Sequence, residues 1–201
     1  MRTLLFSGGV ESTCLAFSHR PDLLLTLDYG QAPAEGEVQA ATALAGKLSL
    51  RHRVIRAPLG HLGAGELIGH PSEHLDRSPE HWPLRNQLLI TLAAMALHDE
   101  GITELLIGTV STDGVHPDGR PAFLAAMEKT VGTQIPRFRL TAPAVEMTTE
   151  ELVRRSQAPI DLLRWTFSCH RAPTACGRCR GCQKSIALFE RLKRGNQRSS
   201  A

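Results

Sequence analysis

The sequence predicts an α/β fold in which a doubly wound, mostly parallel sheet is followed by a C-terminal helical segment with a metal-binding knuckle. Three observations support this prediction. Short apolar segments alternate with amphipathic ones along the first half of the chain, a glycine pair directly follows the first apolar segment, and four cysteines lie within fourteen residues near the C-terminus. A chain of 201 residues, 42% of them hydrophobic, is long enough for one sizeable core.

The expected strands and helices follow one another in a regular order. Residues 23–28 form a continuous apolar run, which is typical of a parallel strand buried on both faces. Residues 34–48 carry apolar side chains at three- and four-residue spacing and predict a helix. Strands are expected at residues 3–6, 23–28, 53–56, 104–108 and 140–143. Helices are expected at residues 10–18, 34–48, 83–99 and 119–130, and another one after the N-cap Thr148, with Glu151 at the capping-box position.

A long loop is expected at residues 60–82, which are rich in glycine and histidine. The spacing of its histidines fits no helix face, so exposed loop residues are favoured over a metal site for His61, His70, His74 and His81. A loop of this length is typical of a lid, and we expect it to cover a bound nucleotide. The predicted organisation is a Rossmann-like domain over residues 1–145 and a helical segment over residues 146–201, packed on the same unit.

The glycine pair lies in a segment, Ser7 to Thr13, that predicts an anion-binding loop. Gly8 and Gly9 can adopt positive φ and leave no side chain between an anion and the backbone N–H groups. The helix expected from Val10 would add the positive end of its dipole. The lysine of a Walker A loop is absent. An ordinary strand-to-helix turn is the alternative interpretation of these residues alone.

Polar residues at the expected carboxyl ends of strands indicate where a ligand would lie, because ligands of open α/β sheets gather at that edge. Asp28 and Asp113 lie in such positions. Arg85 belongs to the first turn of its helix, where a cation is unfavourable, which hints that it serves an anion or a substrate. Asp118 and Arg120 are candidates for binding a substrate. The alternative for Asp118 is a cap of the helix that begins near Gly119.

The cysteines have the form C-x6-C-x2-C-x2-C and predict a metal site. Closely spaced thiolates can reach one tetrahedral ion, so zinc is favoured over an iron–sulfur cluster or a pair of redox disulfides. A site with four cysteine ligands is closed and therefore structural. The predicted ligands are Cys169, Cys176, Cys179 and Cys182. The fifth cysteine, Cys14, is expected to be a small buried hydrophobe.

Composition limits the class of protein. No apolar run approaches the ~20 residues that a membrane span needs, and no charged leader precedes the first strand, so a cytoplasmic protein without a membrane partner is expected. The net charge is +3, with much of the basic excess near the C-terminus. A solvated helix face is favoured over a nucleic-acid patch for these basic residues, which are Lys184, Arg191, Lys193, Arg194 and Arg198.

The loop Ser7-Gly8-Gly9-Val10-Glu11-Ser12 resembles the S-G-G-x-D-S loop of the ATP pyrophosphatases. Together with four other segments it resembles the 7-cyano-7-deazaguanine synthase family over nearly the whole chain. Those segments are Asp28-Tyr29-Gly30-Gln31, Pro83-Leu84-Arg85-Asn86, Pro117-Asp118-Gly119-Arg120 and the cysteine run. The resemblance implies an ATP-dependent carbon–nitrogen ligase that uses magnesium and adenylates the carboxylate of 7-carboxy-7-deazaguanine. Ammonia then gives the amide, and a second activation gives the nitrile.

Residues are assigned to the expected sites as follows. The predicted ATP site comprises Phe6, Ser7, Gly8, Gly9, Val10, Glu11, Ser12, Thr13, Asp28 and Gly108. The predicted substrate site comprises Tyr29, Gln31, Arg85, Asn86, Asp113, Asp118 and Arg120. The predicted catalytic residues are Glu11, Asp113 and Asp118.

Several residues depart from the family pattern. Glu11 replaces Asp, Ala32-Pro33 replace Arg-His, His116 replaces Tyr, Gly119 replaces Cys, and six residues instead of eight separate the first two cysteines of the run. These changes suggest a paralogue that keeps carboxylate adenylation but stops at the amide or uses an amine of a protein or another macromolecule. The product, the amine and the oligomeric state, a homodimer included, stay open.

Two further interpretations fit parts of the sequence. One is a zinc-ribbon nucleic-acid-binding module with contacts from Arg171, Arg178, Arg180 and Lys184. It leaves the glycine loop unexplained, and no aromatic residue lies among the arginines of the cysteine run to stack on bases. The other is a tRNA-thiolating relative, but such enzymes often use a catalytic cysteine and Cys14 is poorly placed for one.

Overall fold

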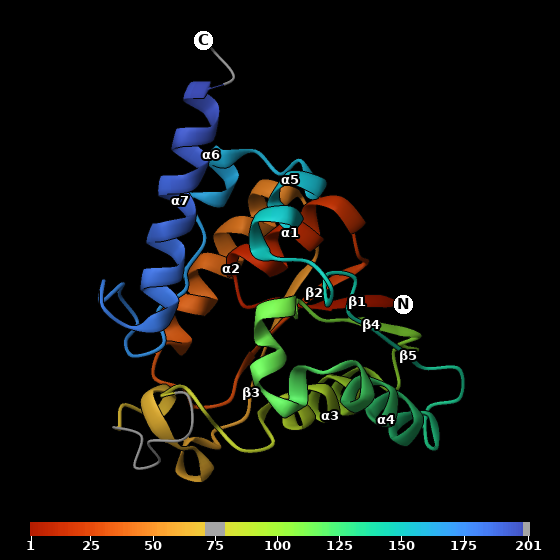
Figure 1. Ribbon diagram of the computed structural model, residues 1–201. Helices are drawn as coiled ribbons and strands as arrows, with labels where there is room; N and C mark the ends of the chain where they lie inside the picture. Colours follow the sequence, from red (N-terminus) through yellow and green to blue (C-terminus); the bar gives the residue numbers. More distant parts are fainter. Residues whose placement is uncertain (71–78, 199–201) are drawn as a thin grey trace.

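The computed structural model describes residues 1–70 and 79–198 and contains a five-stranded parallel sheet with the order β3-β2-β1-β4-β5 (Figure 1). Leu4 of the central strand pairs with Leu24 on one side and with Leu106 on the other. The strands are β1 (Arg2–Leu5), β2 (Leu23–Asp28), β3 (His52–Arg56), β4 (Glu104–Leu106) and β5 (Arg139–Thr141). The order reverses between β1 and β4, so a crevice is expected at the carboxyl ends of these two strands.

Helices cover both faces of this sheet. Helices α1, α2, α5, α6 and α7 lie on one side, and α3 and α4 lie on the other (Figure 1). The helices are α1 (Val10–His19), α2 (Ala34–Leu48), α3 (Arg85–Leu97), α4 (Pro121–Gly132), α5 (Thr149–Ser156), α6 (Ile160–Leu163) and α7 (Arg180–Arg198). Single 3-10 turns are η1 (Gly60–Leu62), η2 (Gly65–Ile68), η3 (Ser111–Val115) and η4 (Pro117–Gly119). The predicted doubly wound fold is confirmed.

Alternate residues of each strand enter two separate cores. Leu24 packs with residues of α1 and α2, whereas its neighbours Leu23 and Leu25 pack with residues of α3. This explains why β2 is apolar at nearly every position. Residues of α5, α6 and α7, including Leu152, Leu163 and Leu188, belong to the same core as α1. The C-terminal segment is thereby packed on the sheet through side chains of its own.

Local sequence patterns located most elements well. β2 and α2 have the expected bounds, and the capping box of α5 is present: the Thr148 hydroxyl accepts from Glu151 N at 3.2 Å, and the Glu151 carboxylate accepts from Thr148 N at 2.8 Å. β4 ends at Leu106, two residues earlier than expected. The largest difference is α7, which was expected only as a basic helix face and begins inside the cysteine run.

The segment predicted to be a long loop has ordered turns where it is described. η1 and η2 precede residues 71–78, which lie outside the described residues together with His74. Leu67 and Trp82 flank that gap and are both buried in the core on the α3 side. His61 and His70 are exposed, as expected. The role of this segment as a lid stays a prediction. None of the helices in residues 1–70 and 79–198 combines the length and apolar composition that crossing a bilayer requires.

Candidate active site

The glycine loop between β1 and α1 leaves an open helix N-terminus at the crevice. Gly8 has a φ of 74°, and a Cβ at this position would lie 2.8 Å from the backbone nitrogen of Ala41 in α2. Gly9 is the N-cap of α1 and provides no side-chain cap. The first N–H groups of a helix have no intrahelical acceptors, and here they carry the positive end of the α1 dipole. The loop is therefore shaped to receive an anion.

A lysine from the far end of the chain reaches this loop. Lys184 of α7 places its Nζ 2.8 Å from Glu11 Oε1 and 3.9 Å from Asp113 Oδ1. The Thr149 hydroxyl also donates to Glu11 Oε1, at 2.8 Å. The prediction that Lys184 belongs to a solvated helix face is wrong, because the packing of α7 on the α1 side of the sheet turns this residue toward the loop. Lys184 supplies the ammonium group that the loop itself lacks.

The electrostatics of this ion pair favour the charged forms of both partners. Burial alone would raise the pKa of Glu11, but the ammonium of Lys184 and the bond from Thr149 outweigh burial and hold that pKa below its usual value. Burial alone would lower the pKa of Lys184, and the Glu11 carboxylate raises it above its usual value instead. A charged ammonium group is therefore held beside the Glu11 carboxylate in the first turn of α1.

Two cavities meet at the glycine loop. The first, here called the strand-end cavity, has a volume of about 330 Å³ and lies over the carboxyl ends of β1, β2 and β4. The second, here called the loop cavity, has a volume of about 280 Å³ and lies between the glycine loop and the cysteine segment. Glu11, Arg85 and Asp113 line both of them. A ligand with an anionic part and an apolar part could occupy the two together.

Many of the predicted site residues line these cavities. The predicted residues that line the strand-end cavity are Phe6, Ser7, Glu11, Ser12, Tyr29, Arg85, Asn86, Gly108 and Asp113. Gly9 and Val10 line the loop cavity. Gly108 lies against α1, since a Cβ there would be 3.4 Å from the backbone nitrogen of Ser12. These residues come from four separate segments that the parallel sheet brings to one edge.

Asp118 is hydrogen-bonded to the start of α3. Its Oδ2 accepts a hydrogen bond from Asn86 N at 3.2 Å, and its backbone oxygen accepts from Asn86 Nδ2 at 2.9 Å. Asn86 lies in the first turn of α3, so Asp118 caps α3 and not the helix that follows Gly119. Asp118 does not line either cavity, and the proposal of a base contact finds no support in this geometry.

Other predicted residues also lie away from the cavities. Asp28 accepts from Gly30 N at 3.2 Å and pairs with Arg56 at 3.6 Å. Gln31 is 4% exposed and lines neither cavity, and its amide is hydrogen-bonded to Tyr29, Leu27 and Glu37. Arg120 is exposed, Thr13 is fully buried, and Gly8 is turned toward α2.

Sequence reasoning missed several ionisable residues that line the strand-end cavity, notably Glu37, Glu80 and His170. Glu80 is buried, and burial alone would raise its pKa. Its contacts with His116 and with Arg180, whose Nη1 lies at 2.7 Å, hold that pKa at about 2. Burial raises the pKa of Glu37 to about 7, although Gln31 and Arg85 favour the charged form. No local motif marked these residues, because their positions depend on the packing of distant segments.

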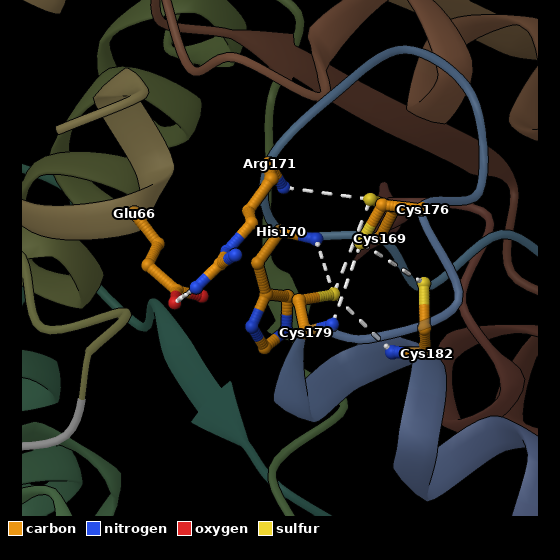
Figure 2. Close-up of polar contacts among 7 residues, drawn as sticks. All are labelled: Glu66, Cys169, His170, Arg171, Cys176, Cys179 and Cys182. Carbon is orange, nitrogen blue, oxygen red and sulfur yellow. Dashed lines mark hydrogen bonds and ion pairs between the residues drawn. The ribbon is translucent and has the colours of Figure 1, made fainter. Parts of the chain in front are cut away.

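The four predicted cysteine ligands form one cluster (Figure 2). Their sulfur atoms all lie within 4.8 Å of one another. Backbone N–H groups of His170, Cys179 and Cys182 donate to sulfur atoms at 3.3 to 3.4 Å. Bonds from the backbone of residues 178 and 179 lower the pKa of Cys176 to about 6, whereas burial raises the pKa of Cys179 and of Cys182. The donor set and its closeness fit a single tetrahedral ion.

The cysteine cluster is connected both to the glycine loop and to the segment that precedes α3. Phe167 N donates to Gly8 O at 2.9 Å, which places the start of the cysteine segment on the loop. Arg171 forms an ion pair with Glu66, as Figure 2 shows. Arg180 forms a second ion pair, with Glu80 of the strand-end cavity. The segment that carries the cluster therefore contacts the glycine loop on one side and residues 66 and 80 on the other.

Comparisons with known proteins agree with this geometry. The family model of the queuosine biosynthesis protein QueC matches residues 2–193. The chain is 31% identical to 7-cyano-7-deazaguanine synthase 1 of Desulfitobacterium hafniense (strain Y51), over 93% of this chain and 91% of that protein. It is 33% identical to 7-cyano-7-deazaguanine synthase of Thiobacillus denitrificans (strain ATCC 25259 / T1), over 90% of this chain and 89% of that protein.

Among solved structures, the chain is similar to the U34-tRNA thiolase NcsA from Methanococcus maripaludis with its [4Fe-4S] cluster. The TM-score is 0.52 at 13% sequence identity, and the match covers 96% of this chain and 65% of the thiolase. This chain thus spans about two thirds of the length of that protein. At so low an identity the similarity concerns the fold alone, and it agrees with the parallel sheet described above.

Proposed function

The chain belongs to the QueC family of queuosine biosynthesis proteins, and we propose that it uses ATP to adenylate the carboxylate of a 7-deazaguanine base, after which an amine displaces AMP. The observation that carries this proposal is the convergence of Lys184, Glu11 and the open N-terminus of α1 on the loop cavity, which adjoins the strand-end cavity and its apolar strand ends. Such a site can hold a polyphosphate next to an organic acid.

Each part of the site has a distinct task in this proposal. The first N–H groups of α1 and the ammonium of Lys184 bind phosphate oxygens and stabilise the negative charge that develops on pyrophosphate. Arg85 lines both cavities and is placed to bind the carboxylate of the substrate. Tyr29 lies in the floor of the strand-end cavity, where the planar base or the adenine would pack. Adenylation needs no covalent enzyme nucleophile, and the arrangement offers charge and positioning instead.

Magnesium and a structural metal complete the proposal. Glu11 and Asp113 are the carboxylates next to Lys184, and oxygen ligands suit Mg²⁺, which would neutralise charge on the departing pyrophosphate. The cluster of Cys169, Cys176, Cys179 and Cys182 is proposed to hold zinc. Four thiolates leave no open coordination position, so this ion would stabilise the fold and take no part in the reaction.

The proposal is tested by the products that form from ATP, magnesium, 7-carboxy-7-deazaguanine and ammonia. We expect AMP and pyrophosphate, together with an amide or a nitrile detected by mass spectrometry. ADP and phosphate as the primary products would refute adenylation. His116 and Gly119, which depart from the family pattern, both line the strand-end cavity. This observation favours a second candidate, an amine of a protein or another macromolecule as the acceptor, for which adducts of candidate protein amines are measured in parallel.

A further inference from the structure

Glu37 occupies the point where the two cavities join. It lies in the first turn of α2 and lines both the strand-end cavity and the loop cavity. In the proposed reaction the bond that breaks joins the acyl group to the α-phosphate, so the reacting atoms must lie where the organic part and the anionic part of the ligand meet. In the proposed reaction Glu37, which lines both cavities, would lie next to the reacting atoms.

The Glu37 carboxylate is held in place from beneath. Gln31 Nε2 donates to Glu37 Oε2 at 2.7 Å. The Gln31 amide is itself fixed, because its Oε1 accepts from Tyr29 N at 2.8 Å and its Nε2 also donates to the backbone oxygen of Leu27 at 3.2 Å. Gln31 and Tyr29 are both buried. A carboxylate supported by such a chain of hydrogen bonds keeps one orientation toward the cavity.

Three carboxylates line both cavities, and their environments differ. Glu11 is paired with Lys184 at 2.8 Å, and Asp113 accepts from Val110 N at 3.1 Å and lies 3.9 Å from the same lysine. In the described part of the chain no cation comes within ion-pair distance of Glu37, although Arg85 lies near enough to favour its charged form and Asp28 disfavours it. Burial raises the pKa of Glu37 to about 7, so it can both accept and release a proton near neutral pH.

We propose that Glu37 binds the ammonium ion that supplies the new nitrogen and is the general base that converts it to ammonia. The proposal rests on the adenylation reaction proposed above. Ammonia is almost entirely protonated at neutral pH, and the ammonium ion has no lone pair with which to attack. A partly buried anionic carboxylate attracts this cation into the cavity and takes its proton there, next to the acyl carbon.

The step balances as follows. Glu37 takes one proton from the ammonium ion and becomes neutral. The nitrogen lone pair attacks the acyl carbon, and the bond from that carbon to the AMP oxygen breaks, with the electron pair leaving on AMP. The nitrogen loses its second proton to the AMP phosphate or to water, which completes the amide. Glu37 then returns its own proton to water, so one carboxylate serves each turnover.

The test separates adenylation from amine attack in Glu37→Gln. Adenylation is measured as exchange of labelled pyrophosphate into ATP that depends on 7-carboxy-7-deazaguanine. Amine attack is measured twice, with ammonium chloride and with hydroxylamine, which is a far weaker base and is largely unprotonated at neutral pH. We expect the ammonia-supported rate to fall about 100-fold or more, as is typical for loss of a general base. The hydroxylamine-supported rate should fall much less, by about tenfold or under, because hydroxylamine needs no base to release its lone pair at neutral pH.

Two further variants make the result specific. Glu35→Gln neutralises an exposed carboxylate in the same turn of α2 and should leave both rates at the parental level. Glu37→Asp keeps the carboxyl group one methylene further from the cavity and should retain part of the ammonia-supported rate. Equal losses with ammonia and hydroxylamine in Glu37→Gln would overturn the role as a base. An unchanged ammonia rate would overturn it as well, whereas absence of exchange in the parent protein would refute the proposed function itself.

Discussion

Replacing Lys184 by Met tests whether the distant lysine sustains the charge of the anion site. The variant keeps most of the side-chain volume but leaves Glu11 without its cation. Glu11 is 21% exposed and Lys184 is 40% exposed, so the pair is neither deeply buried nor fully solvated. Loss of one partner costs about 3–5 kcal/mol in a buried pair, and exposed pairs contribute about 0–1 kcal/mol. For this intermediate pair we expect a loss of roughly 1–3 kcal/mol.

The loss should depend on pH in a defined direction. In the parent, the pKa of Glu11 lies below its usual value, so the stabilisation from the pair is present above the carboxyl pKa of the unfolded chain and disappears as the pH falls through the lower, folded value. In Lys184→Met, burial is no longer offset, and the pKa of Glu11 should rise above its usual value. The folded variant then binds the proton more tightly than the unfolded chain does, and it loses stability as the pH increases. The deficit should therefore be small at about pH 4 and largest at about pH 8.

Urea unfolding at the two pH values measures this deficit directly. A loss of 2 kcal/mol would lower the midpoint of thermal unfolding by roughly 4–8 °C in a chain of this size. Lys193→Met, which removes an exposed lysine from the same helix, is the matched control and should have little effect at either pH. Lys184→Arg should recover most of the stability, because it keeps the charge. An equal deficit at both pH values would mean that Lys184 contributes through packing alone, and the electrostatic reasoning would be refuted.

Three other predictions concern the parts around the site. Replacing Cys176 by Ser, or treating the protein with a chelator, should weaken the Arg171–Glu66 ion pair that holds residues 60–70. Backbone hydrogen exchange there should become about tenfold faster or more, for a local loss of about 1.4 kcal/mol. Unchanged exchange would contradict the coupling. Gly8→Ala should lower the free energy of urea unfolding by about 2–4 kcal/mol, because its φ is positive and a Cβ there would meet the backbone of α2. Gly46→Ala is the control: a Cβ there meets nothing within 4 Å, so the substitution should be neutral or stabilising. Asp118→Asn should keep the cap of α3, change the stability by less than about 0.5 kcal/mol and leave ATP consumption near the parental rate. Loss of turnover in a folded variant would show that Asp118 contacts the substrate.

Local structure was predictable wherever neighbouring residues determine it. The strand β2 is apolar because helices cover both faces of the sheet, and the same fact makes it visible in the sequence. The capping box at Thr148 and Glu151 is likewise set by residues three positions apart. The end of β4 was less predictable. Its apolar run continues to Ile107, but Gly108 turns aside to lie against the first turn of α1, and that contact depends on another part of the chain.

The candidate site was predictable only in part for the same reason. The glycine loop and the residues at strand ends are placed by the parallel sheet, so Ser7, Arg85 and Asp113 could be assigned to the crevice from the fold class. The hydrogen bond between Asp118 and Asn86 could not be predicted, because Asn86 lies in another helix and the motif around Asp118 fits a cap as well as a substrate contact. Glu37 could not be found either, since a glutamate in the first turn of a helix is common and favourable in itself.

In the proposed reaction, the position of Lys184 would give the cysteine cluster a function beyond general stability. Lys184 lies two residues after Cys182, in the turn of α7 that begins within the cluster. A lysine on an unrestrained helix end would lose up to about 2 kcal/mol of side-chain entropy, plus the cost of ordering its backbone, each time it bound a phosphate. The metal site, when formed, makes this ordering part of folding, so the ammonium is already in place when ATP arrives. Electrostatic stabilisation in an active site depends on such preorganisation. In the proposed reaction, a closed cysteine site that never touches the substrate would therefore still affect the rate of phosphate chemistry about one helical turn away.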